Sequence, residues 1–263
     1  MNRLQSRLAQ SLLALCGAQA AAADPPAASH ADTLTSSGQV DQLSGGGSGR
    51  GGAIDWIRSY ADGDLLSLGA ASFSLAGTRW SFARASAASR PSERLTLLAQ
   101  ASLGSGRDGG GHFEYRIAGV GVGFRAAPSV HLKFDDQYFD VATTQGHLLR
   151  SGVVLLPAAG WSIDGAYARS AGGNLDTAFW TARVERAVAS MRLFGGMARG
   201  RSRTEVFNTG FGSRSETDLH EVFLGFAIPV GSAELTLVAD ALNLDTVRRR
   251  TLTMAVKFAL PGR

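Results

Sequence analysis

The stretch Thr251-Leu252-Thr253-Met254-Ala255-Val256-Lys257-Phe258 alternates regularly between polar and apolar side chains. In an extended chain, one face of this stretch carries the large apolar side chains Leu252, Met254, Val256 and Phe258. The opposite face carries Thr251, Thr253 and Lys257. Because side chains of a β-strand alternate between two faces, the pattern predicts a strand with one apolar and one polar face.

The same alternation continues back through most of the chain, in segments of about ten residues separated by turn residues. We expect strands near 65–75, 79–87, 94–103, 112–124, 130–138, 146–156, 161–169, 177–186, 191–200, 219–228, 233–241 and 248–260. A tilted strand of about ten residues is long enough to cross a bilayer. The connections alternate between short ones and longer ones, of which 201–218 is the longest. The sequence therefore predicts an all-β fold, a single antiparallel up-and-down transmembrane β-barrel of about twelve strands within residues 54–263.

Two alternatives for the architecture stay open. A soluble, secreted β-sandwich that binds a ligand also alternates in polarity. Residues 54–60 have the composition of one further strand, which would make the strand count odd.

The N-terminal part of the chain has a different composition. Arg3 and Arg7 precede an apolar run and then small residues, which predicts a signal peptide over 1–23. The single cysteine, Cys16, lies inside it, so neither a disulfide nor thiol catalysis is expected. Residues 24–53 are rich in Gly, Ser, Ala and Pro and predict a flexible, disordered periplasmic segment.

The charge balance is consistent with this assignment. Charged residues make up only 18% of the chain, and the net charge is +4. Loss of the signal peptide would remove two arginines and no acidic residue, which leaves the chain close to neutral. This balance gives no reason to expect nucleic acid as a partner.

The C-terminal strand carries a family resemblance. Met254, Val256 and Phe258 resemble the assembly signal at the end of Gram-negative outer-membrane β-barrels, which the barrel assembly machinery reads. The resemblance covers roughly residues 65–260 and implies location in the outer membrane, contact with its lipid and assembly by that machinery. In its size, single barrel and short N-terminal segment the chain also resembles the YaiO family. That narrower likeness implies a polysaccharide or an export partner, because the family is associated with exopolysaccharide systems.

The polar faces of the expected strands carry charges of both signs, which only a lumen can accommodate within a bilayer. We expect the lumen to be lined by Glu114, Arg116, Lys133, Asp135, Arg150, Asp164, Arg183, Glu185, Glu221, Glu234, Asp240 and Lys257. This arrangement predicts either a polar channel or an interior closed by ion pairs. Two charged residues, Arg84 and Asp136, fall on the expected lipid-facing side. The aromatic residues near segment ends, including Trp80, Phe113 and Tyr115, predict interfacial girdles.

An enzyme is the other class that we considered. His112, His147 and His220 are expected near the outer rim, and Ser213, Ser215, Glu216 and Asp218 precede His220. A serine hydrolase needs such a base and an orienting acid, and this would make the protein a lipid hydrolase. The chain contains neither Gly-x-Ser-x-Gly nor His-Glu-x-x-His. We therefore expect no catalytic residue, cofactor or metal, and a narrow channel or an accessory barrel of an envelope or exopolysaccharide export system.

Overall fold

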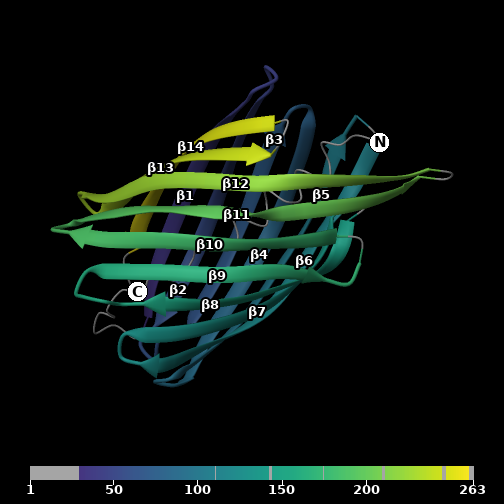
Figure 1. Ribbon diagram of the computed structural model, residues 1–263. Helices are drawn as coiled ribbons and strands as arrows, with labels where there is room; N and C mark the ends of the chain where they lie inside the picture. Colours follow the sequence, from purple (N-terminus) through teal and green to yellow (C-terminus); the bar gives the residue numbers. More distant parts are fainter. Residues whose placement is uncertain are drawn as a thin grey trace.

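The computed structural model describes residues 30–260 except 110, 142–143, 174, 209–210 and 245–246. These residues form one closed antiparallel barrel of fourteen strands, in which each strand pairs with its neighbours in sequence and β1 pairs with β14 (Figure 1). Within the described residues, no helix is long and apolar enough to cross a membrane. The strands are β1 His30–Leu43, β2 Ser48–Tyr60, β3 Leu65–Leu75, β4 Thr78–Ser92, β5 Leu95–Asp108, β6 Gly111–Ala127, β7 Val130–Val141, β8 Thr144–Leu155, β9 Trp161–Ala171, β10 Leu175–Val188, β11 Met191–Asn208, β12 Phe211–Val230, β13 Ala233–Leu244 and β14 Val247–Leu260.

The twelve expected strands correspond to β3–β14, and the barrel gains β1 and β2. The prediction of a flexible segment over 24–53 is therefore wrong from residue 30 onward, and residues 1–29 lie outside the described part. Gly and Ser have low strand propensity, but here β1 and β2 are paired on both sides. Packing also stabilises β2 at Gly51. The ring of Phe73 occupies the space that a side chain at this position would fill, since a Cβ at Gly51 would lie 1.9 Å from Cδ1 of Phe73.

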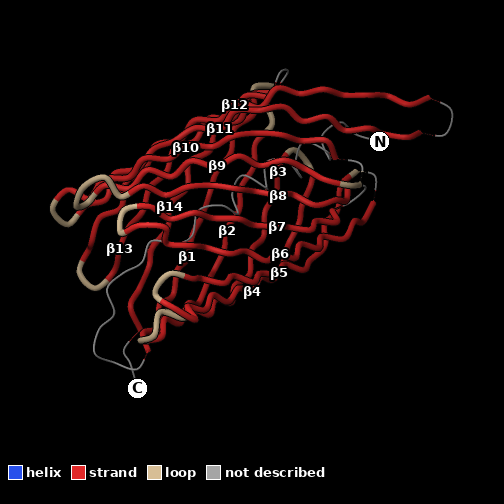
Figure 2. The backbone as a smooth tube through the Cα atoms, turned by 60° about the horizontal axis from the view of Figure 1, so that its bottom comes forward, coloured by secondary structure: helices blue, strands red, loops and turns tan. Residues whose placement is uncertain are grey.

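The even strand number places His30 and Leu260 at the same end of the barrel, which we call the terminal end. The opposite end, the hairpin end, carries the β11–β12 connection. These two strands have 18 and 20 residues and extend beyond the barrel as a hairpin (Figure 2). The expectation of a long loop over 201–218 is wrong, since the strands stay paired from Arg201↔Asp218 to Asn208↔Phe211.

The outer face of the barrel changes character along its length. Its middle is apolar and exposed, with Leu103, Val120 and Leu224 each more than 60% accessible. Toward the hairpin end the outward positions become charged, as from Val120 to Arg116 on β6 and from Leu252 to Arg248 on β14. We call the apolar middle of the outer wall, around Leu103, Val120 and Leu224, the apolar belt. We call the charged outward positions toward the hairpin end, such as Arg116 and Arg248, the charged collar.

Candidate functional site

The lumen is the candidate site, because alternate residues of every strand point into it. On β10, Thr177, Phe179 and Arg183 face the lumen, whereas Trp180 and Val184 face outward and are 40% and 42% exposed. The lumen-facing residues differ in kind between the two ends of the barrel.

The hairpin half of the lumen contains a packed apolar cluster on β3–β10. Two of its members, Tyr115 and Phe139, are only 1% exposed. The cluster comprises Ala71, Leu75, Trp80, Phe82, Tyr115, Ile117, Phe139, Val141, Leu148, Ala168 and Phe179. Lumen-facing positions of a barrel do not need to be polar throughout, and here a large part of them is apolar.

Four of the aromatic residues form a continuous stacked row, which we call the aromatic wall: Phe73, Trp80, Phe82 and Tyr115. The ring centroids of Phe73 lie 5.7 Å from Trp80 and 6.1 Å from Phe82. The rings of Phe82 and Tyr115 lie 4.8 Å apart at 14°. They meet across β5, where Gly104 is the register partner of both residues. The expectation that Trp80, Phe113 and Tyr115 form an interfacial girdle is wrong, because all three face the lumen.

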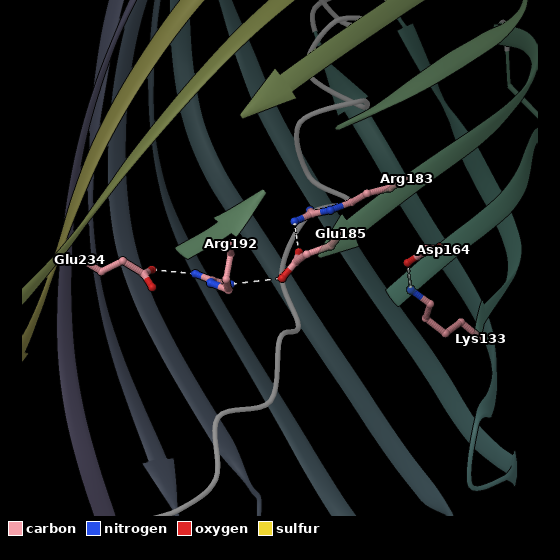
Figure 3. A network of polar contacts seen from close by, with 6 residues as sticks. All are labelled: Lys133, Asp164, Arg183, Glu185, Arg192 and Glu234. Atoms are coloured by element: carbon pink, nitrogen blue, oxygen red, sulfur yellow. Dashed lines mark hydrogen bonds and ion pairs between the residues drawn. The ribbon is translucent and has the colours of Figure 1, made fainter. Parts of the chain in front are cut away.

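The terminal half of the lumen is charged. Arg192 on β11 donates a hydrogen bond of 2.7 Å to Glu234 on β13 and lies 3.5 Å from Glu185 on β10 (Figure 3). Arg183 donates a further bond of 2.7 Å to Glu185. We call Arg183, Glu185, Arg192 and Glu234 the ion-pair chain. Lys133 and Asp164 form a separate pair between β7 and β9.

A second charged cluster lies on the wall opposite the apolar one. Arg249 is only 9% exposed at its side chain and lies 3.9 Å from Asp41 and 3.6 Å from Asp240. Thr251 donates a hydrogen bond of 2.8 Å to Asp41. Asp41 was not among the expected lumen residues because it belongs to the unexpected strand β1.

Ten of the twelve expected lumen residues lie on lumen-facing positions. These are Lys133, Asp135, Arg150, Asp164, Arg183, Glu185, Glu221, Glu234, Asp240 and Lys257. The expectation is wrong for Glu114 and Arg116, which pair with each other on the outer face and are 68% and 55% exposed. Both lie in the charged collar, where the rule that charges must face the lumen does not apply.

The two charges expected to face lipid have different positions. Arg84 faces the lumen, contrary to expectation, and donates a hydrogen bond of 2.6 Å from Nε to Asp55. Asp55 belongs to β2 and was not predicted as a lumen residue. Asp136 does face outward and lies 3.0 Å from Nδ1 of His147.

Where side chains are described, the candidate hydrolase residues do not come together in a catalytic arrangement. His112, His147 and His220 all face outward near the hairpin end, and His112 accepts a hydrogen bond of 3.1 Å from Arg107. The side chains of Ser213, Ser215 and Glu216 lie outside the described residues. Among the side chains that the structure describes, no group of His, Cys, Asp and Glu could hold a metal ion.

The expected assembly-signal residues, Met254, Val256 and Phe258, lie on the outward face of β14, the strand that closes the barrel against β1. A shallow depression of about 610 Å³ also lies on the barrel wall over β2–β5. It is lined mainly by small residues, among them Gly52, Ala70, Ser72, Ser81, Ala83 and Ser105. These positions face outward, so the depression is not part of the lumen.

No protein-family profile and no curated protein sequence matches the chain. Solved structures with a similar fold include the CymD monoaromatic hydrocarbon channel, with a TM-score of 0.59, 10% identity and 89% coverage of both chains. A mutant of the TodX monoaromatic hydrocarbon channel gives 0.58 at 9% identity, covering 88% of this chain and 90% of that one. A bacterial polysaccharide outer membrane secretin gives 0.51 at 9% identity, covering 88% and 98%. The likeness concerns the fold.

Proposed function

We propose that this chain is a non-enzymatic outer-membrane channel whose lumen binds small apolar solutes that contain an aromatic ring. The apolar belt supports placement in a membrane, since lipid requires an apolar outer wall on a closed barrel. The solved barrels of similar fold include outer-membrane channels, which supports the outer membrane of a Gram-negative bacterium as the location.

The aromatic wall carries the proposal. The rings of Phe82 and Tyr115 stack on one another and are buried, so this part of the lumen wall is apolar. Trp80, Phe82 and Tyr115 are each less than 10% exposed, so an apolar ring that enters from the hairpin end first meets Phe73, the half-buried member of the wall, and gains hydrophobic contact there. The solved structures named as monoaromatic hydrocarbon channels agree with this solute class.

Trp80 gives the aromatic wall one hydrogen-bond donor, its indole Nε1. This nitrogen is buried and has no hydrogen-bond partner among the described residues. A buried donor without an acceptor costs about 1–3 kcal/mol, so a solute whose hydroxyl or carbonyl oxygen enters among the side chains that cover Nε1 would gain a hydrogen bond. We therefore expect phenol-like solutes to bind more tightly than the corresponding hydrocarbons.

The ion-pair chain would set the ionic behaviour of the pore. Its two arginines and two glutamates alternate and leave no net charge. We expect weak discrimination between small cations and anions, because selective pores carry rings of one sign.

Trp80 also provides the test, since the other three tryptophans, Trp56, Trp161 and Trp180, face outward. Toluene and p-cresol are titrated into the refolded protein while tryptophan fluorescence is recorded. The proposal predicts a saturable change in emission that is lost in Trp80→Phe and retained in Trp180→Phe. A non-saturable change, or one that is equal in both variants, would contradict binding in the lumen.

An accessory role in polysaccharide export is the second candidate, favoured by the likeness to the polysaccharide outer membrane secretin. Sugar rings also pack on aromatic faces, so the aromatic wall is compatible with a saccharide. Block of ion current by a charged oligosaccharide, but not by p-cresol, would favour this candidate. The export partner and the barrel assembly machinery stay predictions.

A further inference from the structure

In one part of the charged collar, polar residues on four adjacent strands lie side by side as register partners. Arg199 on β11 pairs with His220 on β12, His220 with Asn243 on β13, and Asn243 with Arg248 on β14. All four side chains face outward and are exposed. We call these four residues the basic row. Adjacent strands lie about 4.8 Å apart, so the row presents hydrogen-bond donors across roughly 14 Å of the outer wall.

Two further arginines lie beside these four residues, and from here on the name basic row includes them. Arg250 lies two residues from Arg248 on the same face of β14, a separation of about 7 Å along the strand. Arg50 on β2 lies beyond the intervening strand β1 and is also exposed and outward-facing. The six residues together place four guanidinium groups on one side of the barrel.

These four arginines are not neutralised within the described part of the chain. No ion pair joins Arg50, Arg199, Arg248 or Arg250 to a carboxylate there. The other side of the collar differs, because Arg116 pairs with Glu114 and His147 pairs with Asp136. Other outward arginines, such as Arg79 and Arg169, likewise have no ion pair to a carboxylate among the described residues, but the basic row gathers four such arginines on one side of the barrel, which indicates an anionic partner.

Apolar side chains lie directly below the basic row on the same outer face. Met197 precedes Arg199, Val222 follows His220, and Leu252 follows Arg250, each two residues farther from the hairpin end. They are 40%, 42% and 52% exposed. A partner that fits both surfaces has an anionic head at the level of the arginines and apolar chains beside the belt.

We propose that the basic row binds the phosphate monoesters of an acylated, phosphorylated disaccharide, the lipid A type of glycolipid in the outer leaflet. Guanidinium groups bind phosphate oxygens in a bidentate manner, and His220 and Asn243 provide further donors between them. Two phosphates at opposite ends of two sugar rings match the separated arginines at the two ends of the row. The proposal rests on the membrane placement given above, and it places the hairpin end on the outer leaflet.

The test measures lipid binding by the full-length chain refolded in detergent, with native mass spectrometry as the readout. The probes are bis-phosphorylated lipid A, the same lipid after enzymatic dephosphorylation, and phosphatidylglycerol. We expect the wild type to bind lipid A. The affinity of R248Q/R250Q for lipid A should be at least about tenfold lower, because each lost charge-assisted hydrogen bond weakens binding by about that factor. R116Q is the matched control, since Arg116 is an outward arginine that already has an acidic partner.

Heat-modifiable migration verifies that each variant has folded as a barrel. Equal lipid A binding by the wild type and R248Q/R250Q would overturn the inference, as would an equal loss in R116Q. Equal binding of phosphatidylglycerol or of dephosphorylated lipid A would also overturn it, because the site would not recognise phosphate monoesters. Ion conductance of the same samples separates the two proposals: a wild type that binds lipid A without conducting supports the lipid site and contradicts the channel.

Discussion

Arg84 on β4 and Asp55 on β2 form an ion pair across the intervening strand β3, and Gly69 is the register partner of both. A Cβ at Gly69 would lie 2.0 Å from Oδ1 of Asp55. The pair can therefore form only because this position has no side chain. Lys133 and Asp164 similarly pair across β8, where Gly152 is the register partner of Lys133. Inside this barrel, charges reach their partners over small residues of the strand between them.

Gly69→Ala is therefore expected to displace the carboxylate of Asp55 and to break its bonds to Arg84. The free energy of unfolding should fall by about 2 kcal/mol, because the buried carboxylate of Asp55 loses its charged partner without leaving the lumen wall. Urea unfolding in detergent micelles measures the change. Gly165→Ala is the control, since a Cβ at Gly165 meets no atom within 4 Å. Equal midpoints for the two variants would show that the pair does not depend on the glycine.

Arg192→Gln is expected to make the pore prefer cations. The substitution leaves Glu185 and Glu234 without the cation between them and gives the ion-pair chain a negative charge. One unit charge at about 4 Å contributes about 1 kcal/mol in water, so the cation-to-anion permeability ratio should rise by up to about fivefold. The reversal potential in a salt gradient measures the ratio. Arg186→Gln should leave it unchanged, because Arg186 lies outside the lumen over the ring of Trp161, 4.8 Å away.

Gly51→Ala is expected to move the ring of Phe73 from the barrel wall. The added Cβ would lie 1.9 Å from Cδ1 of that ring, and such overpacking costs about 1–3 kcal/mol. A displaced ring narrows the hairpin half of the lumen, so single-channel conductance should fall. Gly123→Ala tests the alternative that any added methyl group on the lumen wall is sufficient, since its Cβ would lie 3.5 Å from the nearest atom. An equal fall in both variants would contradict a specific role of Phe73.

Removal of residues 205–214 is expected to leave the barrel intact. The backbone of β11 beyond Thr204 and its partners on β12 pair only within the hairpin, which extends away from the barrel (Figure 1). A two-residue turn can replace the deleted part, because the remaining strands stay paired. Heat-modifiable migration and conductance should match those of the full chain. A large rise in conductance would instead show that the hairpin obstructs the pore.

The strand alternation at the C-terminus predicted the closed barrel and twelve of its strands, because period-two patterning reports directly on two-faced strands. The same pattern indicated only the part of β2 at residues 54–60, as an open alternative, and did not reveal the rest of β2 or β1. Gly49, Gly51 and Gly52 give no alternation, and their strand conformation depends on pairing with β1 and β3. The stability of these strands comes from tertiary contacts such as Phe73 over Gly51.

The orientation of individual charges was predictable only where one face of a strand was clearly apolar. Glu114 and Arg116 lie on the same face of β6 as Val120 and Val122, which face outward. The alternation along β6 therefore places Glu114 and Arg116 on the outer face as well. Arg84 shares its face with Phe82 in a lumen that is itself apolar there. An apolar residue in this barrel therefore does not identify the lipid-facing side, and the aromatic wall could not be located from polarity alone.

Single-channel recording from the refolded wild type in a planar bilayer measures directly whether this chain forms an open channel. We expect discrete conductance steps from heat-modifiable protein, reduced reversibly by p-cresol, with the reduction weakened in Trp80→Phe. A folded barrel that inserts into the bilayer and shows no conductance steps would contradict the assignment of this chain as a channel.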